Sequence, residues 1–352
     1  MIDISHIREW IYRKKLLKPV ELPAFVVSVG NISLGGTGKS AFVMLLAEWA
    51  STRGISTVVL SRGYKRKTNG LRILGPGDKL PDAAEIGDEP WMIKHRVPGI
   101  SLLVHADRAR KALRHFQELG SPRLVLLDDA FQHWRCARDL DVLMIDATES
   151  LEQKTLPFGR LRETVLAARR ADLIVITRAN AVSAERLGHI EKRLREAALP
   201  RVQPVWKRHS HSMPKIIAGD YVGSGFLDAR TGAPIEPDRN REYVLVSGIA
   251  KPDHLRSVVK HAGLHVVEEL YFPDHHRLSE ADVRQIRKVL GNLRNGALLI
   301  TEKDWGRWRE LFTGEVNGFV MCVRFVFLKD GPRELELFLA EVAKGAGCST
   351  LP

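Results

Sequence analysis

The chain has 352 residues and a formal net charge of +12, from 54 lysines and arginines against 42 aspartates and glutamates. A hydrophobic fraction of 44% excludes a largely disordered chain, and the length fits one to three domains. No apolar run reaches the roughly 18 residues of a membrane-spanning helix. Three scattered cysteines exclude a disulfide framework. The positive charge favours an anionic partner, such as a phosphate-bearing substrate, nucleic acid or an acidic membrane surface.

Residues 1–23 predict an amphipathic helix with basic residues on one side, ended by Pro19 and Pro23. Two interpretations stay open. The helix either lies in an anionic bilayer interface, with Trp10 and Tyr12 at headgroup depth, or packs on the rest of the protein.

Short apolar runs alternate with helical patterns through residues 24–205. The strand-length runs cover residues 24–29, 57–60, 101–104, 124–127, 142–145 and 173–176. Helical patterns such as 40–52 and 107–119 separate them. Strands that are apolar throughout and alternate with helices predict a mostly parallel sheet with helices on both faces. The expected fold class is α/β.

Residues 206–240 are rich in Gly, Pro, Asp and Ser, and they predict a linker with at most a small hairpin. Residues 241–352 resume the alternation of strands and helices. Strands are expected at 243–246, 265–267, 297–300 and 319–326, and helices at 252–261, 279–290 and 304–311. We therefore expect a smaller second α/β lobe.

A glycine-rich loop follows the first predicted strand and precedes a predicted helix. Its end, Gly38-Lys39-Ser40, fits the P-loop pattern, although Ser33 replaces the opening glycine. The predicted nucleotide-binding residues are Ser33, Leu34, Gly35, Gly36, Thr37, Gly38, Lys39 and Ser40. The glycines let backbone N–H groups approach phosphate oxygens, and the helix dipole favours the anion. Lys39 is expected to reach the β- and γ-phosphates, and the Ser40 hydroxyl to bind Mg²⁺.

Adjacent acids follow another apolar run. Asp128 and Asp129 come directly after residues 124–127, where P-loop enzymes carry a carboxylate that organises Mg²⁺. Asp146, after residues 142–145, has the same context, and the sequence does not choose among the three. ATP is favoured over GTP because the guanine-binding N/T-K-x-D element is absent in register.

Further short motifs follow the loop in order along the chain. They are Val29-Gly30-Asn31, Ser61-Arg62-Gly63-Tyr64, Gly87-Asp88-Glu89-Pro90, Asp107-Arg108, residues 128–133 (DDAFQH), residues 156–163 (LPFGRLRE), residues 272–276 (FPDHH) and Thr301-Glu302-Lys303-Asp304. Together with the P-loop, they resemble the tetraacyldisaccharide 4′-kinase family of lipid A biosynthesis, from about Ser28 to Asp304. The chain departs from the family pattern at Ala41, at Ala130 and in its short, basic N-terminal segment.

The resemblance implies a P-loop NTPase-like kinase that uses ATP and Mg²⁺. The reaction would transfer the γ-phosphoryl group to the 4′-hydroxyl of a tetraacylated glucosamine disaccharide 1-phosphate, giving lipid IVA. Peripheral attachment at the cytoplasmic face of the bacterial inner membrane is implied. By the same resemblance, Asp88 is the catalytic base and Glu89 is a Mg²⁺-linked carboxylate. His275 would reach across the cleft to pair with Asp88, so that the second lobe, residues 241–352, closes over the active site.

Arginines are expected to hold the anionic groups, because a guanidinium makes bidentate contacts with phosphate. Within the family motifs, Arg108 is a candidate catalytic residue for transition-state charge. Arg62, Arg160 and Arg162 are candidates for substrate binding.

Two other functions are weighed. A P-loop GTPase of the metallochaperone or targeting type would share the loop, but it would bring guanine specificity and metal-binding His/Cys clusters. A nucleic-acid-dependent ATPase would account for the charge, yet no nucleic-acid-binding module is visible. We expect no nucleic-acid partner and no obligate protein partner.

Overall fold

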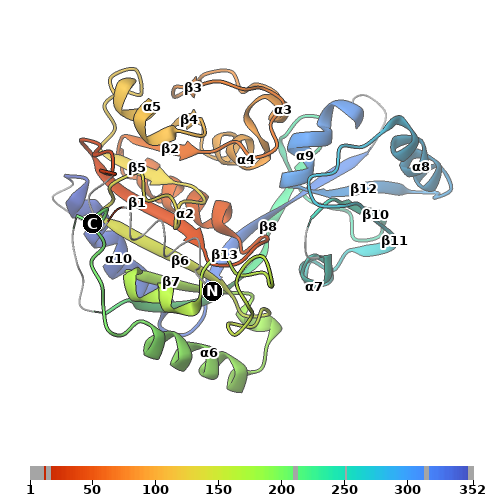
Figure 1. Ribbon diagram of the computed structural model, residues 1–352. Helices are drawn as coiled ribbons and strands as arrows, with labels where there is room; N and C mark the ends of the chain where they lie inside the picture. The colour runs from red at the N-terminus through yellow and green to blue at the C-terminus, as the bar shows by residue number, and fades with distance from the viewer. Residues whose placement is uncertain (1–11, 13–16, 209–212, 250–251, 313–316, 348–352) are drawn as a thin grey trace.

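The computed structural model describes residues 12, 17–208, 213–249, 252–312 and 317–347 (Figure 1). Most of the predicted N-terminal amphipathic helix therefore lies outside the described residues. Tyr12 is described, and its ring packs edge-on against Trp134 and Trp206 with 7% of its surface exposed. This side chain therefore packs on the protein, as the second of the two interpretations expects, and does not lie at headgroup depth.

The first half of the chain forms the expected parallel sheet. Its strands, in spatial order, are β4 (Ser101–Val104), β2 (Thr57–Ser61), β5 (Leu124–Leu127), β1 (Phe25–Asn31), β6 (Leu140–Asp146) and β7 (Leu173–Thr177), and β3 (Arg72–Leu74) pairs antiparallel with the edge strand β4. These parallel strands are buried on both faces, which explains their largely apolar sequences. The loops that follow their carboxyl ends carry the predicted site.

The interval predicted as a linker contains the strand that joins the two halves. In β8 (Lys215–Asp228), residues 215–218 pair with β7, and residues 219–228 pair antiparallel with β13 (Gly318–Phe327). An irregular linker is therefore wrong for residues 215–228. The small hairpin predicted within residues 206–240 is present, because the short β9 (Pro234–Ile235) pairs antiparallel with the end of β8. The glycines that suggested a linker have a packing role. A Cβ on Gly219 would lie 2.3 Å from the carbonyl oxygen of Val326.

The second unit continues the same sheet (Figure 1). Beyond β13 come β12 (Gly296–Thr301), β10 (Glu242–Ser247) and β11 (His265–Tyr271), all parallel to one another. The predicted second α/β lobe is thus built on a shared sheet, and β8 and β13 fix its position relative to the first unit.

Helices cover both faces of the sheet. One face is covered by α2 (Lys39–Thr52), α3 (Ala83–Ile86), α4 (Asp88–Arg96), α8 (Glu280–Gly291), α9 (Glu302–Trp308) and α10 (Gly331–Gly345). The other face is covered by α5 (Arg108–Arg114), α6 (Ala184–Ala197) and α7 (Pro252–His261). Three short segments, η1 (Val165–Arg170), η2 (Ala179–Ala181) and η3 (Arg309–Phe312), are 3₁₀ turns. The last helix, α10, packs on β8 and β1. Residues 331–345 therefore return to the first unit, which the sequence, with its range of 241–352 for the second lobe, did not indicate.

A tight contact between α4 and α9 joins the two units. The rings of Trp91 and Trp305 are 5.6 Å apart and nearly perpendicular, and both are buried. A Cβ on Gly306 would lie 2.5 Å from the Trp91 ring, so the two helices approach at a glycine. Arg96 donates from Nη1 to Oε1 of Glu302 at 2.8 Å. In the part of the chain that the structure describes, no helix has both the length and the apolar character needed to cross a membrane.

Candidate active site

The P-loop connects β1 to α2, as the sequence predicts. Gly35 and Gly38 have φ values of 113° and 83°, which L side chains rarely adopt. The helix begins at Lys39, directly after Gly38. Ser33, which replaces the usual glycine, forms an isolated bridge with Leu161, so the loop is supported on one side by residues 154–163.

Lys39 and Ser40 reach the two predicted acids. Nζ of Lys39 lies 3.4 Å from Oδ1 of Asp129. The Ser40 hydroxyl lies 3.5 Å from Oδ1 of Asp128, and Ser61 donates to the other oxygen of that carboxylate at 3.1 Å. The structure therefore brings together the residues that were predicted from β1 and β5.

The two adjacent acids differ in charge environment. Burial, then repulsion by Asp129 and Glu89, raises the pKa of Asp128 from 3.8 to about 6. Burial opposes ionisation of Asp129 as well, but attraction by Lys39 and Arg162 outweighs it and lowers the pKa of that carboxyl. Asp128 thus carries negative charge that its neighbours do not fully compensate, which is a state that a bound cation relieves.

The residues predicted to bind Mg²⁺, Ser40, Glu89, Asp128 and Asp129, differ in how free they are to do so. Among the described residues, no group of three or more His, Cys, Asp or Glu side chains is arranged to hold a metal. Asp129 is paired with Lys39 and Arg162, and Glu89 lies 3.4 Å from Lys303. Ser40 and Asp128 remain as a hydroxyl and a carboxylate. Two such oxygen ligands suit a Mg²⁺ that takes its other ligands from phosphates and water.

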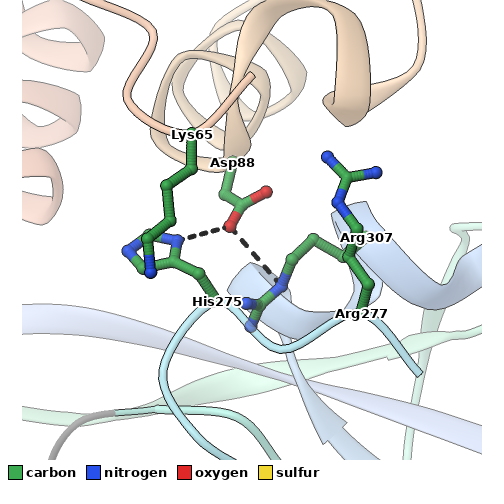
Figure 2. A pocket seen from close by; sticks show the side chains of 5 residues that line it. All are labelled: Lys65, Asp88, His275, Arg277 and Arg307. Carbon is green, nitrogen blue, oxygen red and sulfur yellow. Dashed lines mark hydrogen bonds and ion pairs between the residues drawn. The ribbon is translucent and has the colours of Figure 1, made fainter. Parts of the chain in front are cut away.

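A second cluster forms where the two units meet (Figure 2). Asp88 is the first residue of α4 and is 8% exposed. Its Oδ2 lies 2.8 Å from Nδ1 of His275 and 3.5 Å from Nε of Arg307. The contact that the resemblance implied between Asp88 and His275 is present. Together with Lys65 and Arg277, these residues line an open pocket of about 290 Å³.

Charges from the second unit surround this cluster. Lys303 lies 3.0 Å from Asp274 and 3.4 Å from Glu89, and these two carboxylates outweigh burial and raise its pKa. Asp304 is fully buried and accepts hydrogen bonds from Ser247, Thr301 and Arg307, among other donors. Asp304 therefore fixes the arginine that approaches Asp88.

The four candidate arginines lie in different environments. Arg108 is buried and donates to the backbone carbonyl of Asp129 at 3.1 Å. Arg162 donates to both carboxylate oxygens of Asp129, at 3.0 and 3.2 Å. Arg160 is exposed and donates to the Leu34 carbonyl at 3.4 Å, and Arg62 is exposed near Arg108. All four therefore lie near the phosphate loop or its acids.

Sequence reasoning missed several residues of the site. Arg178 donates to the Gly36 carbonyl and pairs with Asp146, so Asp146 supports the P-loop through that arginine. Lys303 and Arg307 were not predicted either. Arg178 and Lys303 follow the carboxyl ends of β7 and β12, and that position could have identified them. Tyr221 of β8, whose hydroxyl donates to the Gly38 carbonyl at 2.9 Å, had no such signal, because it lies in the predicted linker.

Backbone strain is concentrated at the site. Four non-glycine residues of the site have positive φ values: 56° at Lys65, 46° at Asp129, 54° at Arg178 and 65° at His275. Non-glycine residues adopt this region infrequently, and it is typical of functional loops.

Comparison with known proteins gives the family. The model of the tetraacyldisaccharide-1-P 4′-kinase family (LpxK) matches residues 1–343. A tetraacyldisaccharide 4′-kinase of Pelobacter propionicus is 33% identical over 304 residues, which is 86% of this chain and 78% of the relative. The chain belongs to this kinase family. A tetraacyldisaccharide 4′-kinase of Chlorobaculum tepidum is 32% identical over 354 residues, covering 97% of this chain and 94% of its own.

A solved structure agrees with this assignment. The ATP complex of LpxK from Aquifex aeolicus matches with a TM-score of 0.72 and 28% identity, covering 96% of this chain and 94% of that one. The predicted α/β fold is confirmed, and membership of the tetraacyldisaccharide 4′-kinase family makes the chain an ATP-dependent kinase. The GTPase interpretation is set aside.

The pKa of Asp128 leads to a prediction about stability. Because its pKa is 3.8 ordinarily and about 6 in the native state, ionisation of Asp128 destabilises the fold. This cost is absent below about pH 4 and complete above about pH 6. We expect Asp128→Asn to increase the free energy of unfolding at pH 8 by roughly 1–3 kcal/mol, with little change at pH 4. Urea unfolding of the ligand-free protein at both pH values measures this.

Asp129→Asn is the matched control. Because Lys39 and Arg162 lower the pKa of Asp129, losing that charge should destabilise the protein at pH 8, the opposite sign. Equal effects of the two substitutions at pH 8 would contradict the distinction between the two acids.

Proposed function

We propose that this kinase transfers the γ-phosphoryl group of ATP to the 4′-hydroxyl of a tetraacylated glucosamine disaccharide 1-phosphate, with Asp88 as the general base. The name of the relatives supports this acceptor. The observation that carries the role of Asp88 is its 2.8 Å contact with His275. The buried Asp88 carboxylate is contacted by a histidine of the second unit and lines a pocket. The other lining residues are Lys65, His275, Arg277 and Arg307.

The donor side of the reaction uses the P-loop. Its backbone N–H groups and Lys39 bind the phosphates of ATP, and Arg108 adds positive charge next to Asp129. Ser40 and Asp128 would hold Mg²⁺, which supplies charge neutralisation during phosphoryl transfer. Glu89 links the two halves of the site, because it neighbours Asp88 in α4 and its charge acts on Asp128.

The acceptor side uses Asp88. Both of its contacts among the described residues, with His275 and Arg307, fall on Oδ2. Oδ1 is therefore the oxygen that takes the proton from the attacking hydroxyl. The Nδ1–H of His275 donates to Oδ2 and fixes the carboxylate, and Nε2 of the same ring lies 3.6 Å from Asp274 and 3.8 Å from Glu89.

Basic residues near both halves of the site suit an acceptor that carries a phosphate. Lys65 and Arg277 line the Asp88 pocket, and Arg62 and Arg160 are exposed near the phosphate loop. Arg162 reaches the same region, although it is engaged by Asp129. We assign Arg62, Arg160 and Arg162 to the anionic end of the lipid substrate or to the approach to it.

An apolar tip beside the P-loop supports contact with a lipid surface. Leu34, Leu156 and Phe158 are 37%, 46% and 65% exposed. Their backbones are tied together, because the Leu34 N–H donates to the Arg160 carbonyl and the Leu156 N–H to the Leu161 carbonyl, both at 2.8 Å. Exposed cations flank the tip, including Arg160. Apolar tips with flanking cations suit an anionic bilayer interface, here the cytoplasmic face of the inner membrane, where ATP is available.

The role of Asp88 is tested by substitution. Asp88→Asn keeps the shape and removes the base, so we expect kcat to fall by about 10²- to 10⁴-fold with ATP affinity unchanged. His275→Ala should also lower kcat. His276→Ala is the matched control, because that neighbouring histidine contacts Asp282 instead, at 3.0 Å. Unchanged phosphoryl transfer by Asp88→Asn would refute the assignment, and equal loss in both histidine variants would remove the special role of His275.

The lipid-facing tip is tested with vesicles. The double variant Leu156→Ser/Phe158→Ser should bind anionic phospholipid vesicles about tenfold more weakly. Each apolar side chain gains binding free energy when it is buried in the bilayer interface, and serine loses that gain. Leu113→Ser/Leu337→Ser removes two leucines of similar exposure, 46% and 50%, from α5 and α10. Sedimentation with vesicles compares the two. If both pairs, or neither, weaken binding, the tip is not the contact surface.

A further inference from the structure

Three consecutive carbonyl oxygens of the P-loop are held by side chains from outside the loop. The Gly36 carbonyl accepts from Nη2 of Arg178 at 2.9 Å, and the Thr37 carbonyl accepts from the Thr177 hydroxyl at 3.3 Å. The Gly38 carbonyl accepts from the Tyr221 hydroxyl at 2.9 Å. These contacts span more than 130 residues of sequence, so they depend on the fold and not on the motif.

The three donors are themselves fixed. Thr177 ends β7 and is fully buried, while Arg178 and Tyr221 are 8% and 7% exposed. Arg178 is paired with Asp146 through its other terminal nitrogen. The Tyr221 ring packs against Phe325 of β13, with ring centres 5.1 Å apart. Donors held in this way restrict the orientation of the peptide groups that they contact.

The orientation of the carbonyls determines that of the amides. In a trans peptide, the C=O of one residue and the N–H of the next point in opposite directions. Holding the carbonyls of residues 36–38 toward β7 and β8 therefore directs the N–H groups of Thr37, Gly38 and Lys39 to the other side of the loop. N–H groups of this kind bind the phosphates in a P-loop.

We propose that Thr177, Arg178 and Tyr221 are positioning residues that preorganise the P-loop amides for the phosphates of ATP. The inference rests on the nucleotide site proposed above and adds a set of residues that the P-loop motif does not contain. The need for glycine at position 38 agrees with it, because a Cβ there would lie 1.9 Å from the Tyr221 hydroxyl oxygen. Tyr221 lies in β8, so the same strand that carries the second unit also supports the phosphate loop.

The experiment removes single hydroxyl groups. Tyr221→Phe and Thr177→Val keep the volume of the side chain and delete the donor. We expect the dissociation constant and KM for ATP to rise roughly two- to tenfold for Tyr221→Phe. A smaller rise is expected for Thr177→Val, because that hydroxyl is also 3.3 Å from the Ile145 carbonyl. The KM for the lipid acceptor should stay unchanged in both.

Two matched controls separate positioning from general stability. Tyr243 is fully buried and donates to the Asp238 carbonyl at 3.0 Å, in the second unit. Thr57 is 5% exposed and donates to the Ile55 carbonyl at 2.8 Å, at the start of β2. Tyr243→Phe and Thr57→Val delete comparable hydrogen bonds, so they should lower the melting temperature without raising the KM for ATP.

The outcomes are distinct. A selective rise in the dissociation constant for ATP in the two site variants, absent in the controls, supports the proposal. If the dissociation constant for ATP is unchanged in Tyr221→Phe, or rises equally in the controls, the proposal is overturned. Absence of ATP binding by the unaltered protein would instead overturn the nucleotide site itself.

Discussion

The contact between Asp88 and His275 is the interaction on which the rest of the site depends. The two residues are 187 positions apart, and each comes from a different unit. The distance of 2.8 Å between Oδ2 of Asp88 and Nδ1 of His275 depends on two features of the fold. The pairing of β8 with β13 joins both units in one sheet, and α4 packs on α9 through Trp91 and Trp305. The architecture therefore serves to hold a carboxylate of the kinase core against a histidine of the smaller unit.

The site has two regions that differ in how well their charges are paired, one around Asp88 and one around Asp128. Around Asp88, the acids and the cations of the second unit are paired, as in the contacts of Lys303 with Glu89 and Asp274. Around Asp128, burial and then repulsion by Asp129 and Glu89 raise the pKa of the carboxyl to about 6. The first region suits proton transfer by a fixed carboxylate, and the second suits a cation between the protein and the phosphates.

The strongest sequence signals were local ones. Gly38-Lys39-Ser40 and Asp128-Asp129 each come after an apolar strand. Binding residues in the loop after a parallel strand can be recognised from a short stretch of sequence. His275 was assigned through resemblance, because nothing near it in sequence indicates Asp88. Only residues 215–217 of β8 looked strand-like in the sequence. The rest of the strand was missed because its glycines, which accommodate the close approach of β13, give it the composition of a linker. Arg307 and Tyr221 act through contacts with distant residues, so their roles emerge only from the folded chain.

The measurement that tests the account most directly is transfer of labelled γ-phosphate from ATP to a tetraacylated glucosamine disaccharide 1-phosphate in detergent micelles with Mg²⁺. The site of phosphorylation is then located in the product by mass spectrometry and NMR. The account predicts a labelled lipid that carries the new phosphate at the 4′-oxygen. A folded, ATP-binding protein that leaves this lipid unlabelled, or labels another hydroxyl, would contradict it.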